Sequence, residues 1–496
     1  MLKGTQPDWS PLGGEVVFST GDGDAPGKPA AGKPGRAPFD LQGALAKIGD
    51  AVSTPGIYEA PDHAADYARG KPYWGVLALG GAIVERQALS WSGGQGTELR
   101  ALGDRLRELA HDDALRGVLI RASALAISLP DAIELRAGLH ALRAAGKRVA
   151  CHAEAMTGAA YLVLAACDRL ALAPLGDVVI AGPAAMPVHI KPLLDKLGVQ
   201  ADFVHIGAYK GAADPLTRDA PSKEMAEVIG AILDRRYQTM VDVIAADRKL
   251  APADVQARID TGLFPAEAAR AAGLIDEVGA FEGFRDAQAA GVPWTRLELD
   301  PDRGNQLAMV MRLSRFVGAL PPDRPTGDHV ALVYALGNII DGDGDGALGA
   351  REQIASHTLV PALRALAAND AVKAVVLRID SGGGSALASE LIWRTVAEVK
   401  AKKPVFVSMS DVAASGGYYI ASGATKIFAL PDTLTGSIGV IGGKLAIAGA
   451  LARVGVNTFP VGRGKRSTMM TGMGLWTADL IDWIMADVIT PAESAA

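Results

Sequence analysis

Residues 374–385 read AVVLRIDSGGGS, an apolar run of strand length that ends in three consecutive glycines and a serine. The stretch that lies 257 residues earlier, 117–128, reads GVLIRASALAIS, which keeps the apolar run but has no glycine after it. Apolar residues on both faces are typical of a parallel strand covered by helices, and a glycine-rich turn can lead from such a strand into a helix. The two stretches therefore predict equivalent strand-to-helix units in a repeated fold.

The offset of 257 residues aligns much of the first half of the chain with the second half without a gap. Identical pairs in this register are Leu79 and Leu336, Asp113 and Asp370, Arg121 and Arg378, Tyr161 and Tyr418, Pro174 and Pro431, and Gly198 and Gly455. A repeat of this size is a duplicated domain, because each unit is long enough to bury a core of its own.

Strand-length apolar runs alternate with helical patterns in each copy, which predicts an α/β fold class: two tandem domains with largely parallel sheets. The predicted strands are 76–84, 117–120, 148–152 and 169–173, then 330–340, 374–379, 405–409 and 426–430; the predicted helices are 132–145 and 385–401, with a further helical region over 222–282. We expect a flexible Gly/Pro-rich tail and lead-in over 1–70. The first repeat is predicted over 71–320, and the second repeat, short at its C-terminal end, over 328–496.

The composition excludes several classes of function. The chain has 496 residues, of which 49% are hydrophobic, and its 49 Lys+Arg and 55 Asp+Glu give a net charge of −6, so we expect no nucleic-acid partner. The start of the chain has no basic and apolar leader, and no apolar run reaches about 18 residues, so we expect neither a signal peptide nor a membrane anchor. The two cysteines, Cys151 and Cys167, are expected to be small buried thiols.

The glycines of the second repeat are the first difference between the copies that bears on chemistry. Consecutive glycines such as Gly383 and Gly384 let backbone N–H groups approach a developing negative charge, as in an oxyanion hole. The same residues also fit an ordinary tight turn between a strand and a helix.

A serine and a lysine are divided between the copies. Ser415 begins a predicted helix of the second repeat where the first repeat has Gly158, and Lys210 of the first repeat stands where the second repeat has Ser467. A serine at a helix start has an exposed hydroxyl, although it is also a common N-cap, and a single lysine is usually a surface residue. The complementary distribution predicts that a nucleophile and its base come from different repeats.

Four motifs occur in order along the chain: Tyr209-Lys210 followed by Pro215 and Arg218, then 380–385, 413–419 and 434–439. Together they resemble the bacterial signal peptide peptidases of the protease IV type, in their long tandem-domain form, over about residues 71–475. The resemblance implies a fold of the Clp-protease/crotonase kind and a Ser–Lys dyad assembled across two domains. It implies Ser415 as nucleophile, Lys210 as general base, Ser437 as the hydroxyl that holds the lysine amine, and Gly383 and Gly384 as oxyanion donors.

The resemblance also implies a serine endopeptidase that cleaves extended apolar peptides such as released signal peptides and assembles as a homo-oligomer. It suggests the bacterial cell membrane as the location, whereas the sequence itself assigns no compartment. Gly382 stands where the family has a proline. We assign no cofactor, because the glycines at 436–442 do not follow the dinucleotide fingerprint. We assign no metal, because the two cysteines have no second cysteine pair or nearby histidine cluster that would make a zinc site.

Alternative functions remain open at this level. A crotonase-like acyl-CoA enzyme would use Gly383 and Gly384 to hold a thioester enolate, and a catalytically inactive protein of this fold would only bind peptides. A Ser-His-Asp triad is disfavoured, since His152 and His205 have no matching aspartate arrangement. The segment 341–352 has the spacing of a calcium loop but follows a predicted strand, so we expect a solvated acidic loop, with calcium binding as the alternative.

Overall fold

The computed structural model describes residues 61–86, 96–299, 310–311, 314, 327–344, 353–463 and 466–486. Residues 1–60 of the tail and lead-in predicted over 1–70, residues 321–326 between the two predicted repeats, and residues 345–352 of the acidic segment lie outside this set. Asp62–Ala496 belong to one compact unit. Among the described residues, no helix has the length and apolar character needed to cross a membrane.

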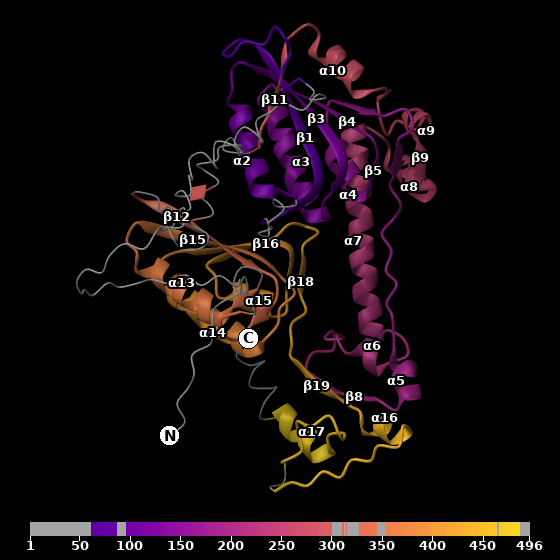
Figure 1. The fold of residues 1–496 in the computed structure, drawn as a ribbon, viewed down its shortest axis with the longest axis vertical. Coiled ribbons are helices and arrows are strands. Elements are labelled where there is room, and N and C mark those ends of the chain that lie inside the picture. Colours follow the sequence, from indigo (N-terminus) through magenta and orange to yellow (C-terminus); the bar gives the residue numbers. More distant parts are fainter. Residues whose placement is uncertain are drawn as a thin grey trace, which may run out of the picture. The chain divides into compact units, whose positions relative to one another are not determined.

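The first repeat is built on a parallel sheet (Figure 1). Its central strands lie in the order β6 (Arg169–Leu172), β4 (Arg148–Ala153), β3 (Leu115–Ala126) and β1 (Tyr73–Val84), and every pairing between them is parallel. The short strands β10 (Glu277–Val278), β11 (Trp294–Leu297) and β2 (Thr97–Glu98) extend it. Three consecutive β3 residues, Val118, Leu119 and Ile120, are at most 1% exposed, as expected for a strand covered on both faces. The helices are α2 (Leu99–Ala110), α3 (Leu129–Ala144) and α4 (Gly158–Leu164).

The second repeat has the same strand order. Its sheet runs β17 (Lys426–Phe428), β16 (Val405–Ala414), β15 (Val372–Ser381) and β12 (His329–Leu336), again with parallel pairings, and β18 (Leu434–Gly436) pairs with the end of β16. The helices are α13 (Ser356–Ala368), α14 (Ala386–Lys400) and α15 (Gly416–Ser422). The predicted α/β class with parallel sheets is confirmed. Most predicted elements recur near their expected bounds, but β3 and β16 run on to Ala126 and Ala414, and the strand predicted over 330–340 is divided into β12 and β13 (Ile339–Ile340).

Element positions support the proposed duplication. Strands β3 and β15 begin 257 residues apart (372 − 115), as do β4 and β16 (405 − 148), β6 and β17 (426 − 169), and helices α3 and α14 (386 − 129). The same offset relates β7 (Asp177–Val179) to β18, and α5 (Lys191–Leu197) to α16 (Ala448–Arg453). The N-cap serines of α3 and α14, Ser128 and Ser385, have the same spacing, so the two halves of the chain have corresponding elements at the predicted offset.

An antiparallel ladder connects the repeats close to the candidate site. Strand β8 (Gln200–His205) of the first repeat pairs with β19 (Ile441–Ala446) of the second, with Ile441 opposite His205. The predicted helical region after it is confirmed as α7 (Lys223–Arg248), α8 (Pro252–Thr261), α9 (Ala266–Ala271) and the start of α10 (Phe281–Ala289). The remaining elements are β5 (Met156–Thr157), β9 (Leu263–Pro265), β13 (Ile339–Ile340), β14 (Ile354–Ala355), α6 (Asp214–Thr217) and α17 (Ala478–Ile484).

The two cysteines form a disulfide, so the prediction of free buried thiols is wrong. Cys151 lies on β4 and Cys167 follows α4, and the reversal of the chain between these elements brings their Cα atoms to 6.0 Å. Both residues are buried, as predicted. A separation of 16 residues carries no local signal for such pairing, because the contact depends on how the helix folds back against its strand.

Candidate active site

Ser415 stands at the turn from β16 into α15 with a backbone φ of 53° and ψ of −120°. Positive φ is unfavourable for residues other than glycine and costs about 1–3 kcal/mol. The equivalent residue of the first repeat, Gly158, also has positive φ. The side chain of Ser415 makes no helix-capping hydrogen bond, so the N-cap interpretation fails. A serine held where a glycine would be relaxed indicates a functional constraint.

Lys210 reaches Ser415 from the first repeat. Its Nζ lies 2.8 Å from Ser415 Oγ, 2.6 Å from the carbonyl oxygen of Ser437 and 3.2 Å from Ser437 Oγ. The lysine is only 4% exposed, and burial lowers its pKa. None of the three oxygens carries a negative charge, so these contacts include no ion pair that would offset the effect of burial on the amine. The predicted residues Ser415, Lys210 and Ser437 are therefore brought together.

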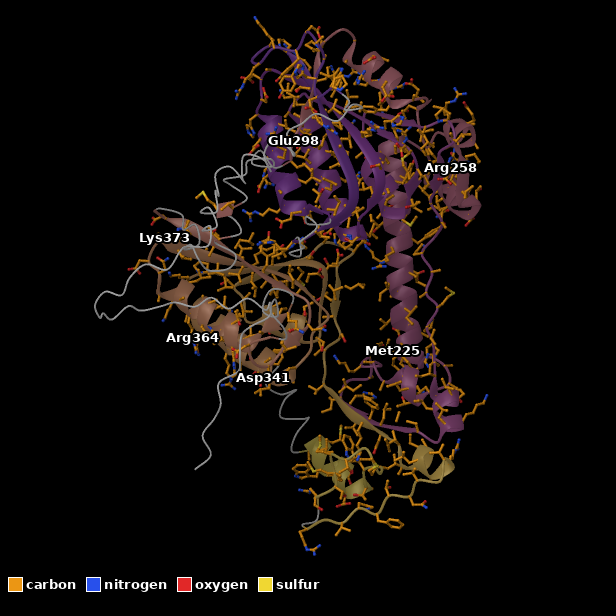
Figure 2. All side chains as sticks on the ribbon, in the orientation of Figure 1. Met225, Arg258, Glu298, Asp341, Arg364 and Lys373 are labelled. Atoms are coloured by element: carbon orange, nitrogen blue, oxygen red, sulfur yellow. A yellow bond between two sulfur atoms is a disulfide. The ribbon has the colours of Figure 1, made fainter. Side chains whose placement is uncertain are left out.

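The loop that carries Lys210 is fixed by close backbone packing. Ile206 donates its N–H to the carbonyl of Val440 at 3.0 Å, which continues the β8–β19 ladder up to the loop. A Cβ on Gly211 would lie 2.2 Å from Cγ of Met225, which stands near the start of α7 (Figure 2). Asp214 accepts a hydrogen bond from the Ser222 N–H at 3.0 Å, and so joins the loop to the α7 N-cap.

The two predicted oxyanion glycines take different positions. Their φ angles are +100° for Gly383 and +154° for Gly384. The N–H of Gly383 donates to Ser381 Oγ at 3.1 Å, so this amide already has a partner within the turn. Gly384 lines the pocket beside Ser415, whereas Gly383 does not. A Cβ on Gly383 would lie 2.8 Å from Ser415 Cβ, so this glycine brings the turn against the serine.

A pocket of about 720 Å³ opens beside the dyad. Its lining includes Lys210, Gly384, Ser385, Ala386, Ser389, Ser415, Gly416, Tyr418, Tyr419, Ser437, Ile438, Val440 and Ile441. Lys210 comes from the loop after β8, and the other residues come from the glycine-rich turn, from α14, from the start of α15 and from the segment that follows β18. A pocket with apolar walls and a few polar groups is the usual form of a small substrate-binding site.

Sequence reasoning missed the main partner of the lysine amine. The shortest contact of Lys210 Nζ is with the backbone carbonyl of Ser437, a group that every residue carries and that therefore leaves no sequence signal. Ser437 has a φ of 50°, which is unusual for a serine. Ser437 comes directly after Thr435 and Gly436 in the chain. The hydroxyl of Thr435 donates to the carbonyl of Ala413 at 2.7 Å.

The histidines and the acidic loop are engaged elsewhere. The ring of His152 is 2.9 Å from the carbonyl oxygen of Gly279 and packs against Phe281, and His205 is exposed on β8. Asp341 accepts a hydrogen bond from Ser356 Oγ at 3.0 Å. Residues 345–352 of the proposed calcium loop lie outside the described residues. Neither histidine contacts Ser415 in the part of the chain that the structure describes.

Replacing Gly384 by alanine should strongly reduce activity by distorting the turn beside Ser415. The added Cβ would lie 2.0 Å from the carbonyl oxygen of Ile339, a backbone atom that cannot move aside cheaply. Gly382 is the matched control, since its Cβ would meet nothing within 4 Å and its φ is not positive. Peptide hydrolysis by the two alanine variants checks this prediction, and comparable activity in both would contradict it.

Comparison with known proteins finds peptidase sequence in both repeats. Residues 141–292 and 397–479 match Peptidase family S49, and residues 349–435 match the Clp protease family. The two S49 segments begin 256 residues apart (397 − 141), close to the repeat offset. Lys210 lies in the first of these segments, and Ser415 and Ser437 lie in the second.

Several similar proteins are named as proteases or as a signal peptide peptidase. "Serine protease SPPA, chloroplastic" of Arabidopsis thaliana is 29% identical over 378 residues, which cover 76% of this chain and 54% of that protein. "Protease 4" of Salmonella typhi is 31% identical over 329 residues, which cover 64% of this chain and 51% of that protein. "Putative signal peptide peptidase SppA" of Enterococcus faecium is 36% identical over 138 residues, which cover 28% of this chain and 40% of that protein. The predicted resemblance is confirmed, and the chain spans about half the length of the first two relatives.

Proposed function

Because peptidase family S49 sequence occurs in both repeats of this chain, we propose that the chain is a serine endopeptidase with a Ser–Lys dyad assembled between them. Ser415 is the nucleophile and Lys210 is the general base. The observation that carries the proposal is the 2.8 Å separation of Lys210 Nζ and Ser415 Oγ, which joins a buried lysine to a serine at positive φ.

The geometry supports a two-step acyl transfer. The neutral amine of Lys210 accepts the Ser415 hydroxyl proton, and the alkoxide attacks the scissile carbonyl carbon. The carbonyl and hydroxyl oxygens of Ser437 hold the resulting ammonium, which then donates its proton to the leaving amine. The N–H of Gly384 is our candidate donor to the oxyanion, since this glycine lines the pocket and Gly383 donates within its own turn. Water then hydrolyses the acyl-enzyme by the same route.

The pocket favours small or apolar side chains beside the cut. Ala386, Ile438, Val440 and Ile441 contribute apolar wall. We therefore propose extended apolar peptides as substrates, with released signal peptides as the specific case, since one relative is named a putative signal peptide peptidase. The homo-oligomer and the location at a bacterial membrane, both implied by the resemblance, stay predictions.

Turnover of a fluorogenic peptide tests the proposal against its rivals. A crotonase-like acyl-CoA enzyme needs no contact between a lysine and Ser415, and an inactive peptide-binding protein would show no turnover. We expect hydrolysis of Ala- and Leu-containing peptides and covalent labelling of Ser415 by a fluorophosphonate. Peptide binding without turnover and without labelling would favour the inactive protein, and acyl-CoA turnover that survives Ser415→Ala would favour the crotonase-like enzyme.

The rate should rise with pH through a single ionisation below the ordinary lysine pKa. Burial lowers the pKa of Lys210, so the neutral, proton-accepting amine becomes populated at a lower pH than in an exposed lysine. Measuring kcat/KM from about pH 5 to pH 10, with and without a metal chelator, checks this. The rise of kcat/KM with pH should not depend on the chelator and should remain in His152→Ala and His205→Ala. Loss of this rise in either variant would favour a histidine base.

A further inference from the structure

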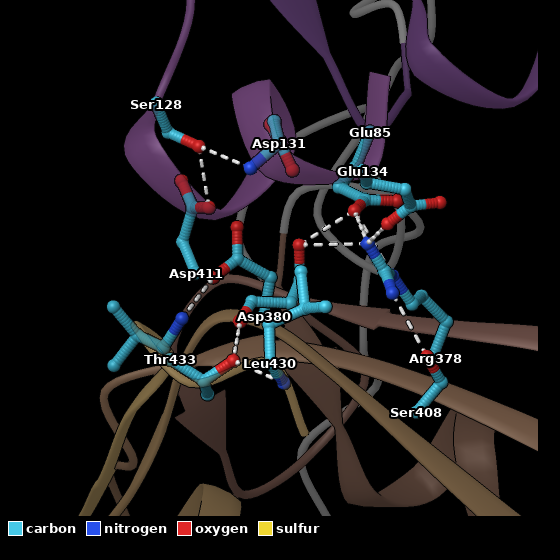
Figure 3. A network of polar contacts seen from close by, with 12 residues as sticks. Glu85, Ser128, Asp131, Glu134, Arg378, Asp380, Ser408, Asp411, Leu430 and Thr433 are labelled. Carbon is cyan, nitrogen blue, oxygen red and sulfur yellow. Dashed lines mark hydrogen bonds and ion pairs between the residues drawn. The ribbon is translucent and has the colours of Figure 1, made fainter. Parts of the chain in front are cut away.

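A network of charged side chains joins residues of the two repeats (Figure 3). Arg378 of β15 donates from Nε to Glu85 at 2.9 Å and from Nη2 to Glu134 of α3 at 3.1 Å, and both carboxylates belong to the first repeat. The same guanidinium donates to Ser408 Oγ at 2.8 Å and to Ser410 Oγ at 3.1 Å on β16. The side chains of Arg378 and Glu85 are 11% and 9% exposed, so this contact lies largely out of water.

The network holds a bulge that leads directly to Ser415. The pairing of β15 with β16 shifts between Ile379 opposite Met409 and Ser381 opposite Ala413, so β16 carries extra residues at 410–412. We call residues 410–412 the β16 bulge. Asp380 accepts a hydrogen bond from the Val412 N–H at 3.1 Å, and Asp411 accepts one from Ser128 Oγ at 2.6 Å. The bulge is thus tied to its own sheet on one side and to the first repeat on the other.

The network contains more carboxyl groups than cations. Its acidic groups are Glu85, Asp131, Glu134, Asp380 and Asp411, and the guanidinium groups acting on them are Arg378 and Arg236 of α7. Asp131 of α3 is 4% exposed, and its Oδ1 is buried without a hydrogen-bond partner among the described residues. Within that part of the chain, no group of three or more acidic, histidine or cysteine side chains could hold a metal ion. The charge of Arg378 and the hydrogen bond of Ser128 favour the ionised form of this carboxyl, but burial and the charges of Asp411 and Glu85 outweigh them, so the protonated form is stabilised.

The repeat register shows that the fold does not need a carboxyl at this position. Asp131 corresponds to Ala388 of the second repeat (388 − 131 = 257), and Ala388 is completely buried. The preceding N-cap serines are equivalent as well, since Ser128 accepts from the Asp131 N–H at 3.1 Å and Ser385 accepts from the Ala388 N–H at 3.2 Å. An alanine suffices for the helix start, so the carboxyl of Asp131 requires another explanation.

We propose that the Asp131 carboxyl is a proton-binding site between the repeats, and that loss of its proton to solvent loosens the β16 bulge and displaces Ser415. An ionised Asp131 repels Asp411, whose contact with Ser128 fastens the bulge to the first repeat. Burial, together with the charges of Asp411 and Glu85, raises the pKa of Asp131 to about 7. The pKa values of Asp380 and Asp411 are also raised, chiefly by burial. The proposal that Asp131 binds a proton does not depend on the proposed peptidase activity, whereas the proposed effect on Ser415 rests on that activity.

Thermal unfolding of the full chain from pH 5 to pH 9 tests proton binding without reference to activity. The pKa of this carboxyl is higher in the folded chain than its unfolded value of about 4. Below pH 4 the group therefore does not reduce the free energy of unfolding, and between pH 4 and pH 7 its ionisation destabilises the folded chain increasingly, until the loss is complete above pH 7. Asp131→Asn removes that loss. We expect the Tm of this variant, relative to the unmodified chain, to rise by roughly 2–6 °C between pH 5 and pH 8.

Two further variants keep this test decisive. Glu154→Gln is the matched control, because Glu154 occupies the position of Asp411 in the first repeat and its side chain is 62% exposed; its Tm difference should not change with pH. Asp131→Ala reproduces Ala388 and replaces Asp131→Asn if the amide variant fails to fold. A Tm difference that is constant with pH in the Asp131 variant would overturn the proposal.

The effect on Ser415 is measured by the ratio of kcat/KM for Asp131→Asn to that of the unmodified chain. The ionisation of Lys210 affects kcat/KM equally in both proteins, so it cancels in the ratio. We expect the ratio to rise severalfold through about pH 7, and fluorophosphonate labelling of Ser415 to follow it. If the ratio does not change with pH but the Tm difference does, Asp131 binds a proton without affecting Ser415, and the second part of the proposal is wrong. Absence of turnover and labelling in both proteins would instead contradict the proposed function.

Discussion

Replacing Ser415 by alanine should lower kcat for peptide hydrolysis on the order of 10⁴-fold or more, the scale seen when a covalent nucleophile is removed. The hydroxyl is the atom that would bond to the substrate carbonyl, and its proton acceptor, Lys210 Nζ, lies 2.8 Å away. Ser437 Oγ is a hydrogen-bond partner of the same amine at 3.2 Å, and we expect it not to replace the Ser415 hydroxyl as nucleophile. Steady-state turnover of a fluorogenic peptide measures the loss.

Two substitutions make the result specific to the hydroxyl. Ser467→Ala removes an exposed serine, the residue that matches Lys210 in the repeat register, and should keep full activity and fluorophosphonate labelling. Ser415→Gly reproduces Gly158 and should be as inactive as Ser415→Ala, yet no less stable than the unmodified chain, because glycine accepts positive φ without strain. Activity within a few-fold of the unmodified chain in Ser415→Ala would remove this serine from the mechanism.

The repeat register explains how much of the site could be predicted from one sequence. Within a duplicated fold, identical residues maintain the shared core, so differences such as Gly158 against Ser415 and Lys210 against Ser467 mark positions under another constraint. The parallel strands place Ser415 at the carboxyl end of β16, whereas Lys210 is placed by the antiparallel ladder of β8 with β19. The structure also shows that both equivalent turns have positive φ, which glycine adopts without strain and serine does not.

The features that escaped prediction depend on contacts without a local pattern. The Cys151–Cys167 disulfide depends on how α4 folds back against β4. The Ser128–Asp411 hydrogen bond joins residues 283 positions apart, and each of these side chains alone looks like a cap or a surface acid. The partner of the Gly383 amide depends on the rotamer of Ser381. Periodicity and turn chemistry describe a residue's own element, whereas these contacts depend on how elements pack against one another or on which rotamer a side chain adopts.

Removal of the Lys210 amine should be nearly as damaging as loss of the nucleophile. Lys210→Met keeps most of the buried aliphatic volume but has no proton acceptor, so kcat should fall on the order of 10³-fold or more while the fold is retained. Lys210→Arg should fail as well, because a guanidinium stays protonated and cannot act as a base. Lys191→Met is the matched control, since Lys191 is a partly exposed lysine paired with Asp195 on α5, and it should leave turnover unchanged.

The pH dependence of the residual activity separates a base from a lysine that only holds the turn together. If Lys210 accepts the proton, the ionisation that controls the unmodified chain disappears in Lys210→Met, and the remaining rate should follow hydroxide concentration. If Lys210 only fastened Ser437 to Ser415, through its contacts at 2.6 Å and 2.8 Å, Lys210→Arg could supply the same donors and keep the original ionisation. An arginine variant with substantial turnover and an unchanged pH profile would therefore assign the lysine a structural role and leave the base to be found elsewhere.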